Sequence, residues 1–257
     1  MQGALRAARS IIYRTGHLLV LGGSFALALL MPDAEAALGI ALLATALFMV
    51  LLEWLMPARP DWKQTGKERA EMVSVFVGLA FVFLLVVEFY DASVAPMLAG
   101  LRDSLGLAIW PVGLPVALQV VMLYFASELI YYWLHRAIHA SGLFWRVSGH
   151  GFHHSYRKLH SLHSGTNHPF EIVYLALPAL LLGALFGADR DVIAMATVLI
   201  SVNALVVHAN VDLETPVLSF FVTNARHHRR HHSTVFEQSN TNFSCNAIIW
   251  DRLFGTF

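Results

Sequence analysis

The sequence has little charge and almost no cysteine. Charged residues make up 13% of the 257 residues and hydrophobic residues 57%, whereas soluble domains carry about 25% charged residues, so the composition indicates a membrane protein. The formal net charge is zero with histidine neutral, which gives no electrostatic reason for nucleic-acid binding, and we predict no nucleic-acid partner. The single cysteine, Cys245, excludes an internal disulfide and a metal site built on several thiolates.

Histidine, by contrast, is abundant, with 14 in the chain. Residues 226–232, within the segment ARHHRRHHS, hold four histidines and three arginines. Most histidines are uncharged at neutral pH, so a merely basic patch would use Lys or Arg instead. The spacing of these histidines recurs upstream and indicates a different role.

Six apolar runs provide candidate membrane helices, at about 17–31, 36–56, 72–90, 107–134, 171–187 and 191–207. A spanning helix needs about 20 predominantly apolar residues, so the second, third and fourth runs suffice and the others are short. The last two, joined by the polar turn GADRD, either form a hairpin that dips into the bilayer or span it with mismatch. We expect the fourth helix to begin after Pro111 and Pro115. The first run resembles a signal peptide without a clear cleavage site, and we interpret it as a retained membrane segment.

Basic residues are distributed unevenly around these runs. With six crossings and a cytosolic N-terminus, only Arg102 and Arg190 of the 17 Lys and Arg residues lie outside, as the positive-inside rule predicts. The same topology brings every histidine from His135 to His232 to the cytosolic face. We therefore predict an all-α integral membrane protein with four to six transmembrane helices, whose N-terminus and histidine-bearing helical cap, from about 135–170 and 208–257, are cytosolic. No repeat or long linker divides residues 1–257, so we expect a single membrane domain with N-terminal membrane helices over about 1–110.

Three histidine clusters share one spacing rule. LHRAIH places two histidines four residues apart, and HGFHH and HRRHH each place three at i, i+3 and i+4. Such spacings lie on one face of a helix, so each cluster can direct its imidazoles at a common point. Eight nitrogens exceed the needs of one tetrahedral zinc and suffice for two metal ions, although imidazole suits Zn, Cu, Fe and Ni alike. The eight predicted ligands are His135, His139, His150, His153, His154, His228, His231 and His232.

Other polar residues near the clusters are further candidates. His168 in NHPFE and His208 in HANVD lie where a membrane segment meets the cap, and we predict both as ligands, with hydrogen bonding as the alternative role. Glu128 precedes His135 by seven residues, so its carboxylate can accept a ring N–H and fix a ligand's tautomer, or else pair two helices. The lone His17 fits an interfacial or hydrogen-bonded residue. Weaker candidates, which duplicate a cluster without completing it, are His160, His163 and His227.

Several segments together resemble the fatty acid hydroxylase (sterol desaturase) superfamily of histidine-rich membrane enzymes. These segments are ELIYYWLHRAIH, HGFHH, NHPFE, HANVDL, HHRRHHS and NTNFSCNAIIWDRLFGT, and they cover about residues 125–257. The resemblance places the family's ligand motifs, HxxxH, HxxHH and HxxHH, on the eight cluster histidines, with His208 at a further common ligand position and His168 at the usual His-Pro position. The chain departs from the family pattern at Glu128 (often Asp), Ala225 (Pro) and Ser244 (Gly), none of which removes a ligand.

The resemblance implies a dioxygen-dependent dimetal oxidoreductase that hydroxylates or desaturates a C–H bond of a membrane lipid, such as a fatty acyl chain or sterol. It implies two iron ions, with zinc able to replace them in purified material, and dioxygen as cosubstrate. Electrons must come from a separate donor, cytochrome b5-like or ferredoxin-like, because the sequence shows no dinucleotide fingerprint and no cysteine set for an iron–sulfur cluster. The alternative is a metal transporter or metal-storage membrane protein, although transporters usually place ionisable ligands near the middle of the membrane.

Two sets of side chains around the clusters have open roles. Arg226, Arg229 and Arg230 either dock an acidic redox partner or bind lipid phosphates. Aromatic residues near the clusters either line the path of a lipid chain or anchor the protein at the membrane interface. These aromatic residues are Tyr131, Tyr132, Trp133, Phe144, Trp145, Phe152 and Phe170.

Overall fold

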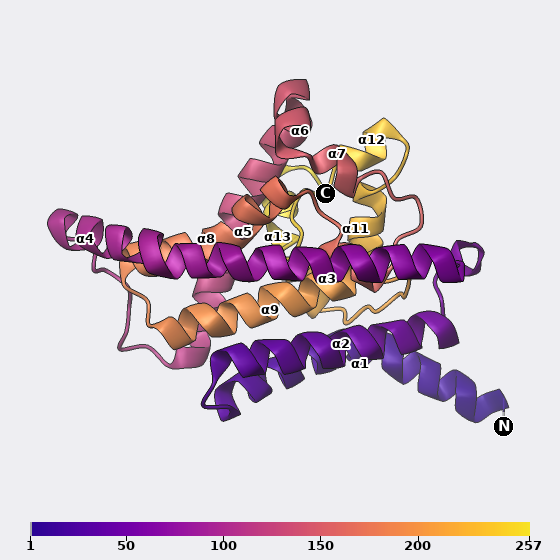
Figure 1. The fold of residues 1–257 in the computed structure, drawn as a ribbon. Helices are drawn as coiled ribbons and strands as arrows, with labels where there is room; N and C mark the ends of the chain where they lie inside the picture. The colour runs from indigo at the N-terminus through magenta and orange to yellow at the C-terminus, as the bar shows by residue number, and fades with distance from the viewer. Residues whose placement is uncertain (1) are drawn as a thin grey trace.

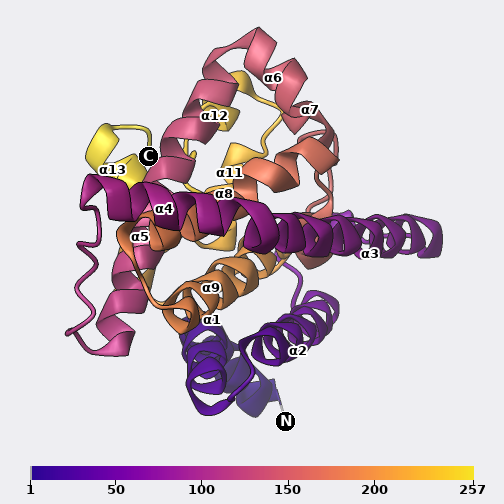
Figure 2. The same cartoon turned by 60° about the vertical axis from the view of Figure 1, so that its left-hand side comes forward.

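Helices supply all the regular secondary structure in the part of the chain that the computed structural model describes. That part is residues 2–257, without the side chains at 2–5, 34–35, 172–173 and 175–177. Several long helices run in similar directions, another crosses them steeply, and short ones gather on the side away from the first two (Figures 1 and 2). The long helices are α1 (Gln2–Leu30), α2 (Ala34–Leu55), α3 (Gly66–Phe89), α5 (Val116–Ala140), α8 (Pro169–Phe186) and α9 (Arg190–His208).

Five helical stretches are long and apolar enough to cross a membrane: 6–30, 36–55, 66–105, 116–140 and 190–208. Large apolar side chains such as Leu19, Leu43 and Phe81 remain exposed on them, because helices in a bilayer turn apolar residues outward as well as inward. This arrangement confirms the predicted all-α integral membrane fold. The fourth apolar run also behaves as expected, since α5 begins directly after Pro115.

The third stretch is longer than its apolar run predicted. A π-helical turn, Tyr90–Val94, joins α3 to α4 (Ala95–Leu105) without a break. Forty residues at 1.5 Å each span about 60 Å, roughly twice the hydrocarbon core of a bilayer. Within the π-helical turn, Asp91 forms an ion pair of 2.6 Å with Arg190 at the start of α9. The turn therefore marks the level at which α9 begins, and α4 extends beyond it.

The ends of the long helices fall into two sets, as alternating crossings require. At one end, Tyr13 of α1 hydrogen-bonds Glu214, which follows α9, at 2.7 Å, and Lys158 of the cap pairs with Glu68 of α3 at 2.9 Å. At the other end, the Trp110 backbone N–H before α5 donates to the carbonyl oxygen of Phe186, the last residue of α8. We call the first the histidine end, because α5 and α9 finish there with His139 and His208 in their last turns.

Short elements build the cap at the histidine end, as the sequence predicted. Most are one or two turns long and follow either α5 or α9 in the chain. They are η1 (Pro60–Trp62), α6 (Gly142–Ser148), α7 (His150–His153), η3 (Ser161–Gly165), α10 (Leu218–Phe221), α11 (Ala225–His231), α12 (Phe236–Ser239) and α13 (Ile249–Phe254).

Buried hydrogen bonds tie the cap to the membrane helices. His17 of α1 is fully buried and its Nε2–H donates to Asn203 of α9 at 2.6 Å, so it has the hydrogen-bonded role expected for a lone histidine. The Asn203 amide in turn donates to Asn246 at 3.1 Å. A second anchor is Glu53 at the end of α2, which accepts the backbone N–H groups of Ser161 and Asn210 at 2.7 and 2.9 Å.

Candidate metal centre

Four elements from distant parts of the sequence carry the histidines to one place. The last two turns of α5 carry two, α7 and the residue that ends it carry three, and α9 carries one in its last turn. α11 and the residue that ends it carry three more, besides His227 in the first turn of α11. Gly149 separates α6 from α7 with a φ of +76°, and a Cβ there would collide with the His168 ring. Asn224 starts α11 by accepting the N–H groups of Arg226 and His227.

The histidines form two groups, each with its candidate ligand atoms within 4.8 Å of one another. The first histidine group combines residues of α5, α7 and α11, and the second combines residues of α7, α9 and α11. Nine of the ten predicted ligands belong to these groups, and His168 does not. The first group is His135, His139, His150, His154 and His231; the second is His153, His208, His228 and His232.

Each three-histidine cluster is divided between the groups, contrary to the expectation of one common point per cluster. His150 and His154 belong to the first group, whereas His153 belongs to the second. Likewise His228 and His232 share the second group, and His231 joins the first. At 3.6 residues per turn, positions i and i+4 are only about 40° apart around a helix, whereas i+3 and i+4 are about 100° apart. The i+3 imidazole therefore faces the neighbouring group.

Oxygen acceptors around the groups hold the outward ring nitrogens. The Nδ1 atoms of His135 and His231 donate to the carbonyl oxygens of Phe243 and Thr241 at 2.5 and 2.8 Å. In the second group, the Nδ1 of His208 donates to the carbonyl oxygen of Ala204 at 2.7 Å. A ring whose Nδ1 carries the proton presents an unprotonated Nε2. Outward contacts of this kind orient metal-binding histidines in proteins.

Among the described residues, Glu171 is the one carboxylate that contacts a ring of either group, a role that we did not predict for it. Its Oε1 accepts the Nδ1–H of His150 at 2.5 Å, and both side chains are almost fully buried. The prediction had assigned this role to Glu128, which instead accepts the backbone and side-chain N–H groups of Asn246 at 3.0 and 2.9 Å. The signal for Glu171 was its place in NHPFE, where the structure puts it in the first turn of α8.

The inward nitrogens approach one another in a way that fits bound cations. The Nε2 atoms of His135 and His150 are 2.8 Å apart, although both rings carry their proton on Nδ1. Those of His153 and His208 are 3.2 Å apart. Two lone pairs facing each other repel unless a cation lies between them. Two nitrogens that bind one ion at right angles, each about 2.1 Å from it, are about 3.0 Å apart. The observed separations of 2.8 and 3.2 Å therefore fit a metal ion in each group.

Burial also keeps the rings in the neutral form that binds metals. It holds the pKa of His153, His154, His228 and His232 well below 6.5, with neighbouring imidazoles adding to the effect. Burial lowers the pKa of His231 to about 3. Neutral imidazoles need not lose a proton before binding an ion.

The remaining candidate histidines have other contacts. The Nδ1 of His168 accepts the Phe170 N–H at 3.3 Å and caps α8, so we do not include His168 among the proposed ligands. His160 pairs with Glu53 at 2.9 Å, and the Nδ1 of His227 accepts the Asn224 N–H at the start of α11. His163 is buried beside the second group and donates to the carbonyl oxygen of His153 at 2.9 Å.

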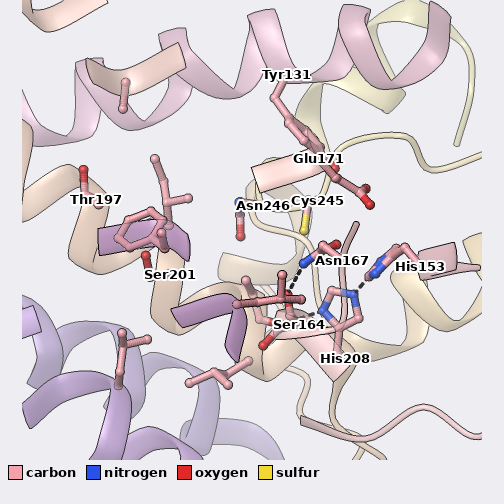
Figure 3. Close-up of a pocket in the computed structure, with 18 of the residues that line it drawn as sticks. Tyr131, His153, Ser164, Asn167, Glu171, Thr197, Ser201, His208, Cys245 and Asn246 are labelled. Carbon is pink, nitrogen blue, oxygen red and sulfur yellow. Dashed lines mark hydrogen bonds between the residues drawn. The ribbon is translucent and has the colours of Figure 1, made fainter. Parts of the chain in front are cut away.

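A cavity of about 230 Å³ reaches the second histidine group from the membrane helices. His153 and His208 lie at one end, and Thr197 and Ser201 of α9 lie toward the other (Figure 3). His228 also lines the cavity. Between them the wall is mainly apolar, with side chains from α2, α3, α8 and α9. Ala80 of α3 lines the cavity and is exposed, and it lies within a helical stretch that is long and apolar enough to cross a membrane.

The aromatic residues predicted beside the clusters contribute little to this cavity. Tyr131 is the one member of that set among the described lining residues, and Phe76 and Phe83 of α3, which were not predicted, line it as well. Phe144, Phe152, Phe170 and Trp133 are exposed, as interfacial or lipid-facing aromatic residues are. For these exposed residues the structure favours the second of the two roles left open by the sequence. The cavity depends on how α3 packs, which the local sequence near the clusters does not reveal.

Fold and geometry define an all-α membrane protein with a buried polyhistidine site that could hold two metal ions. The chain belongs to the fatty acid hydroxylase family, which matches residues 120–256. Its relatives include the ornithine lipid hydroxylase OlsE of Rhizobium tropici, 30% identical over 84% of this chain and 65% of that protein. The methylsterol monooxygenase 2-2 of Arabidopsis thaliana is 27% identical over 61% of this chain and 58% of that protein.

A further relative is the very-long-chain aldehyde decarbonylase GL1-8 of Oryza sativa subsp. japonica, 29% identical over 77% of this chain and 69% of that protein. The chain thus spans about two thirds or less of the length of OlsE and of the methylsterol monooxygenase. No solved structure matches the chain.

Proposed function

We propose that the protein is a non-haem diiron oxidoreductase that uses dioxygen to hydroxylate or desaturate a C–H bond of a membrane lipid. The observation that carries the proposal is the meeting of the membrane-facing cavity with the second histidine group. A lipid chain in that cavity would present a carbon beside His153, His208 and His228. The family membership and the names of the lipid-oxidising relatives support the same reaction class.

Two iron ions held by the two groups would supply the dioxygen activation that oxidation of an unactivated C–H bond requires. The residues of this chain do the rest. Glu171 and the backbone carbonyls hold the rings in one tautomer, and six of the nine group histidines are buried, which limits the access of water to them. The mainly apolar wall of the cavity would hold the hydrocarbon chain of the lipid in place by apolar contacts.

Electrons would come from a separate cytochrome b5-like or ferredoxin-like donor. We place the histidine end, and with it the N-terminus, on the cytosolic side, where such donors are found. This orientation is supported by the positions of Arg102 and Arg190, the two basic residues that the positive-inside count leaves outside. Arg190 pairs with Asp91, and Arg102 donates to the carbonyl oxygen of Ala184 near the end of α8, so both lie at the end opposite the histidines.

Mass spectrometry of lipids tests the proposal. Iron-loaded protein, reconstituted with lipid extract, dioxygen and a reductant, should produce a lipid with one added oxygen or with two hydrogens fewer. His153→Ala combined with His231→Ala, which removes a ligand from each group, should abolish the product, whereas His160→Gln, outside both groups, should retain it. Unchanged oxidation in the double variant, or metal uptake into vesicles without oxygen consumption, would refute the proposal.

A further inference from the structure

A second hollow, of about 750 Å³, lies on the cap and reaches histidines that do not line the membrane cavity. We call it the arginine cleft. His139, His154 and His232 line it, whereas the cavity is lined by three other histidines, and the two hollows share no lining residue. No Asp or Glu is among the described residues that line the cleft. Its arginines are Arg59, Arg157, Arg226, Arg229 and Arg230.

The cleft keeps unbalanced positive charge. Arg59, Arg226 and Arg229 pair with Asp61, Glu214 and Asp212 at 3.1, 2.9 and 2.9 Å. Arg157 and Arg230 are exposed, and neither has a carboxylate partner within 4.0 Å in the described part of the chain. The buried Nε of Arg229 also has no hydrogen-bond acceptor there. The two exposed guanidinium groups of Arg157 and Arg230 are therefore free to bind an anion.

The rim of the cleft is apolar. Ser141, Gly142 and Trp145 of the α6 region line the cleft, and α6 turns Leu143, Phe144 and Val147 outward with 67%, 53% and 65% of their surface exposed. On another part of the lining, Phe236 is 70% exposed. Exposed apolar patches beside basic residues mark surfaces that lie in the headgroup region of a bilayer.

We propose that the arginine cleft binds the anionic phosphate head group of a membrane lipid, with the lipid tails along the apolar rim. One arginine side chain can donate two parallel hydrogen bonds to two oxygens of a phosphate. The cleft volume of 750 Å³ lies within the roughly 300–1,000 Å³ of small-ligand pockets, whereas protein interfaces are broad and flat. This lipid is distinct from the one in the membrane cavity, because the histidine groups separate the two hollows. Its head group covers His139, His154 and His232 and excludes water from the cap side of the site.

Native mass spectrometry of the protein released from nanodiscs tests this binding without any oxidation assay. The discs contain equal parts of phosphatidylcholine and phosphatidylglycerol. The wild type should retain phosphatidylglycerol over phosphatidylcholine, and Arg157→Gln with Arg230→Gln should reduce that retention by about tenfold, since two charge-assisted contacts are lost. The matched control, Lys63→Gln with Lys67→Gln, removes two exposed charges at the same end of the protein and should retain the lipid.

A second variant provides an independent test in case the arginine double variant does not fold. Thr234→Glu adds a negative charge to the cleft, leaves every arginine in place and should weaken phosphatidylglycerol retention as well. Equal retention in the wild type and the cleft variants would overturn the proposal, as would full displacement of the lipid by inorganic phosphate, which would identify a free-anion site. Loss of binding to an acidic electron donor with unchanged lipid retention would overturn it in favour of partner docking.

Discussion

Replacing Glu171 by Gln should weaken metal binding in the first histidine group and leave the second intact. The Glu171 carboxylate accepts the Nδ1–H of His150 at 2.5 Å, and in the described part of the chain it forms no hydrogen bond or ion pair with a ring of the second group. Loss of such an outer contact costs about 10- to 100-fold in metal affinity, or about 1.4 to 2.7 kcal/mol. The side-chain oxygen of Gln can still accept the hydrogen bond from the His150 Nδ1–H, but it carries no charge. The expected loss of metal affinity therefore lies in this range.

The assay is a competition titration of metal-free protein with zinc and a chelator, which resolves two affinities. Glu128→Gln is the matched control, because Glu128 is equally buried, lines the same cavity and contacts Asn246 rather than a histidine. Its variant should keep both affinities. An equal loss at both sites in Glu171→Gln, or the same loss in Glu128→Gln, would refute the assignment of Glu171 to His150.

Three further outcomes are expected. Metal-free protein should lose stability as the pH falls from about 6.5 toward 3, because buried rings such as His231, with a pKa of about 3, stay neutral while the unfolded chain takes up protons; denaturation curves that are flat over this range would contradict it. Ser201→Phe should fill the membrane cavity and abolish lipid oxidation with the metal content unchanged, so undiminished turnover would exclude this cavity as the lipid site. Glu53→Gln should lower the free energy of unfolding by about 1–3 kcal/mol without changing metal content, and a simultaneous loss of metal would show that Glu53 does more than anchor the cap.

The helical membrane fold and most of the site residues could be predicted from local sequence. Apolar run lengths and the positions of Pro111 and Pro115 are local properties, and so are the i, i+3 and i+4 spacings of the histidines. His208 could be chosen because it ends an apolar run, at the same end of the bundle as the clusters. The prediction of His168 rested on a similar position, but its ring turns to cap α8.

The missed features depend on packing between distant segments. Glu171 lies 21 residues after His150, and no spacing rule connects a helix start to a ring in another element. The division of the two three-histidine clusters between the groups depends on how α7 and α11 are placed relative to each other. One ring of each of these clusters, His153 and His231, belongs to a different group from its neighbours. Prediction of the cavity likewise depended on the position of α3. The residues of α3 are mostly apolar, so the sequence does not indicate which face of this helix lines a ligand site.

Metal analysis of the purified protein shows directly whether the nine histidines hold two metal ions in separate groups. Wild-type protein from iron-rich cultures should contain close to two metal ions per chain. His139→Ala with His231→Ala should leave one, His208→Ala with His232→Ala should leave one, and all four substitutions together should leave none. A wild type with a single ion, or loss of both ions in either double variant that remains folded, would contradict the account.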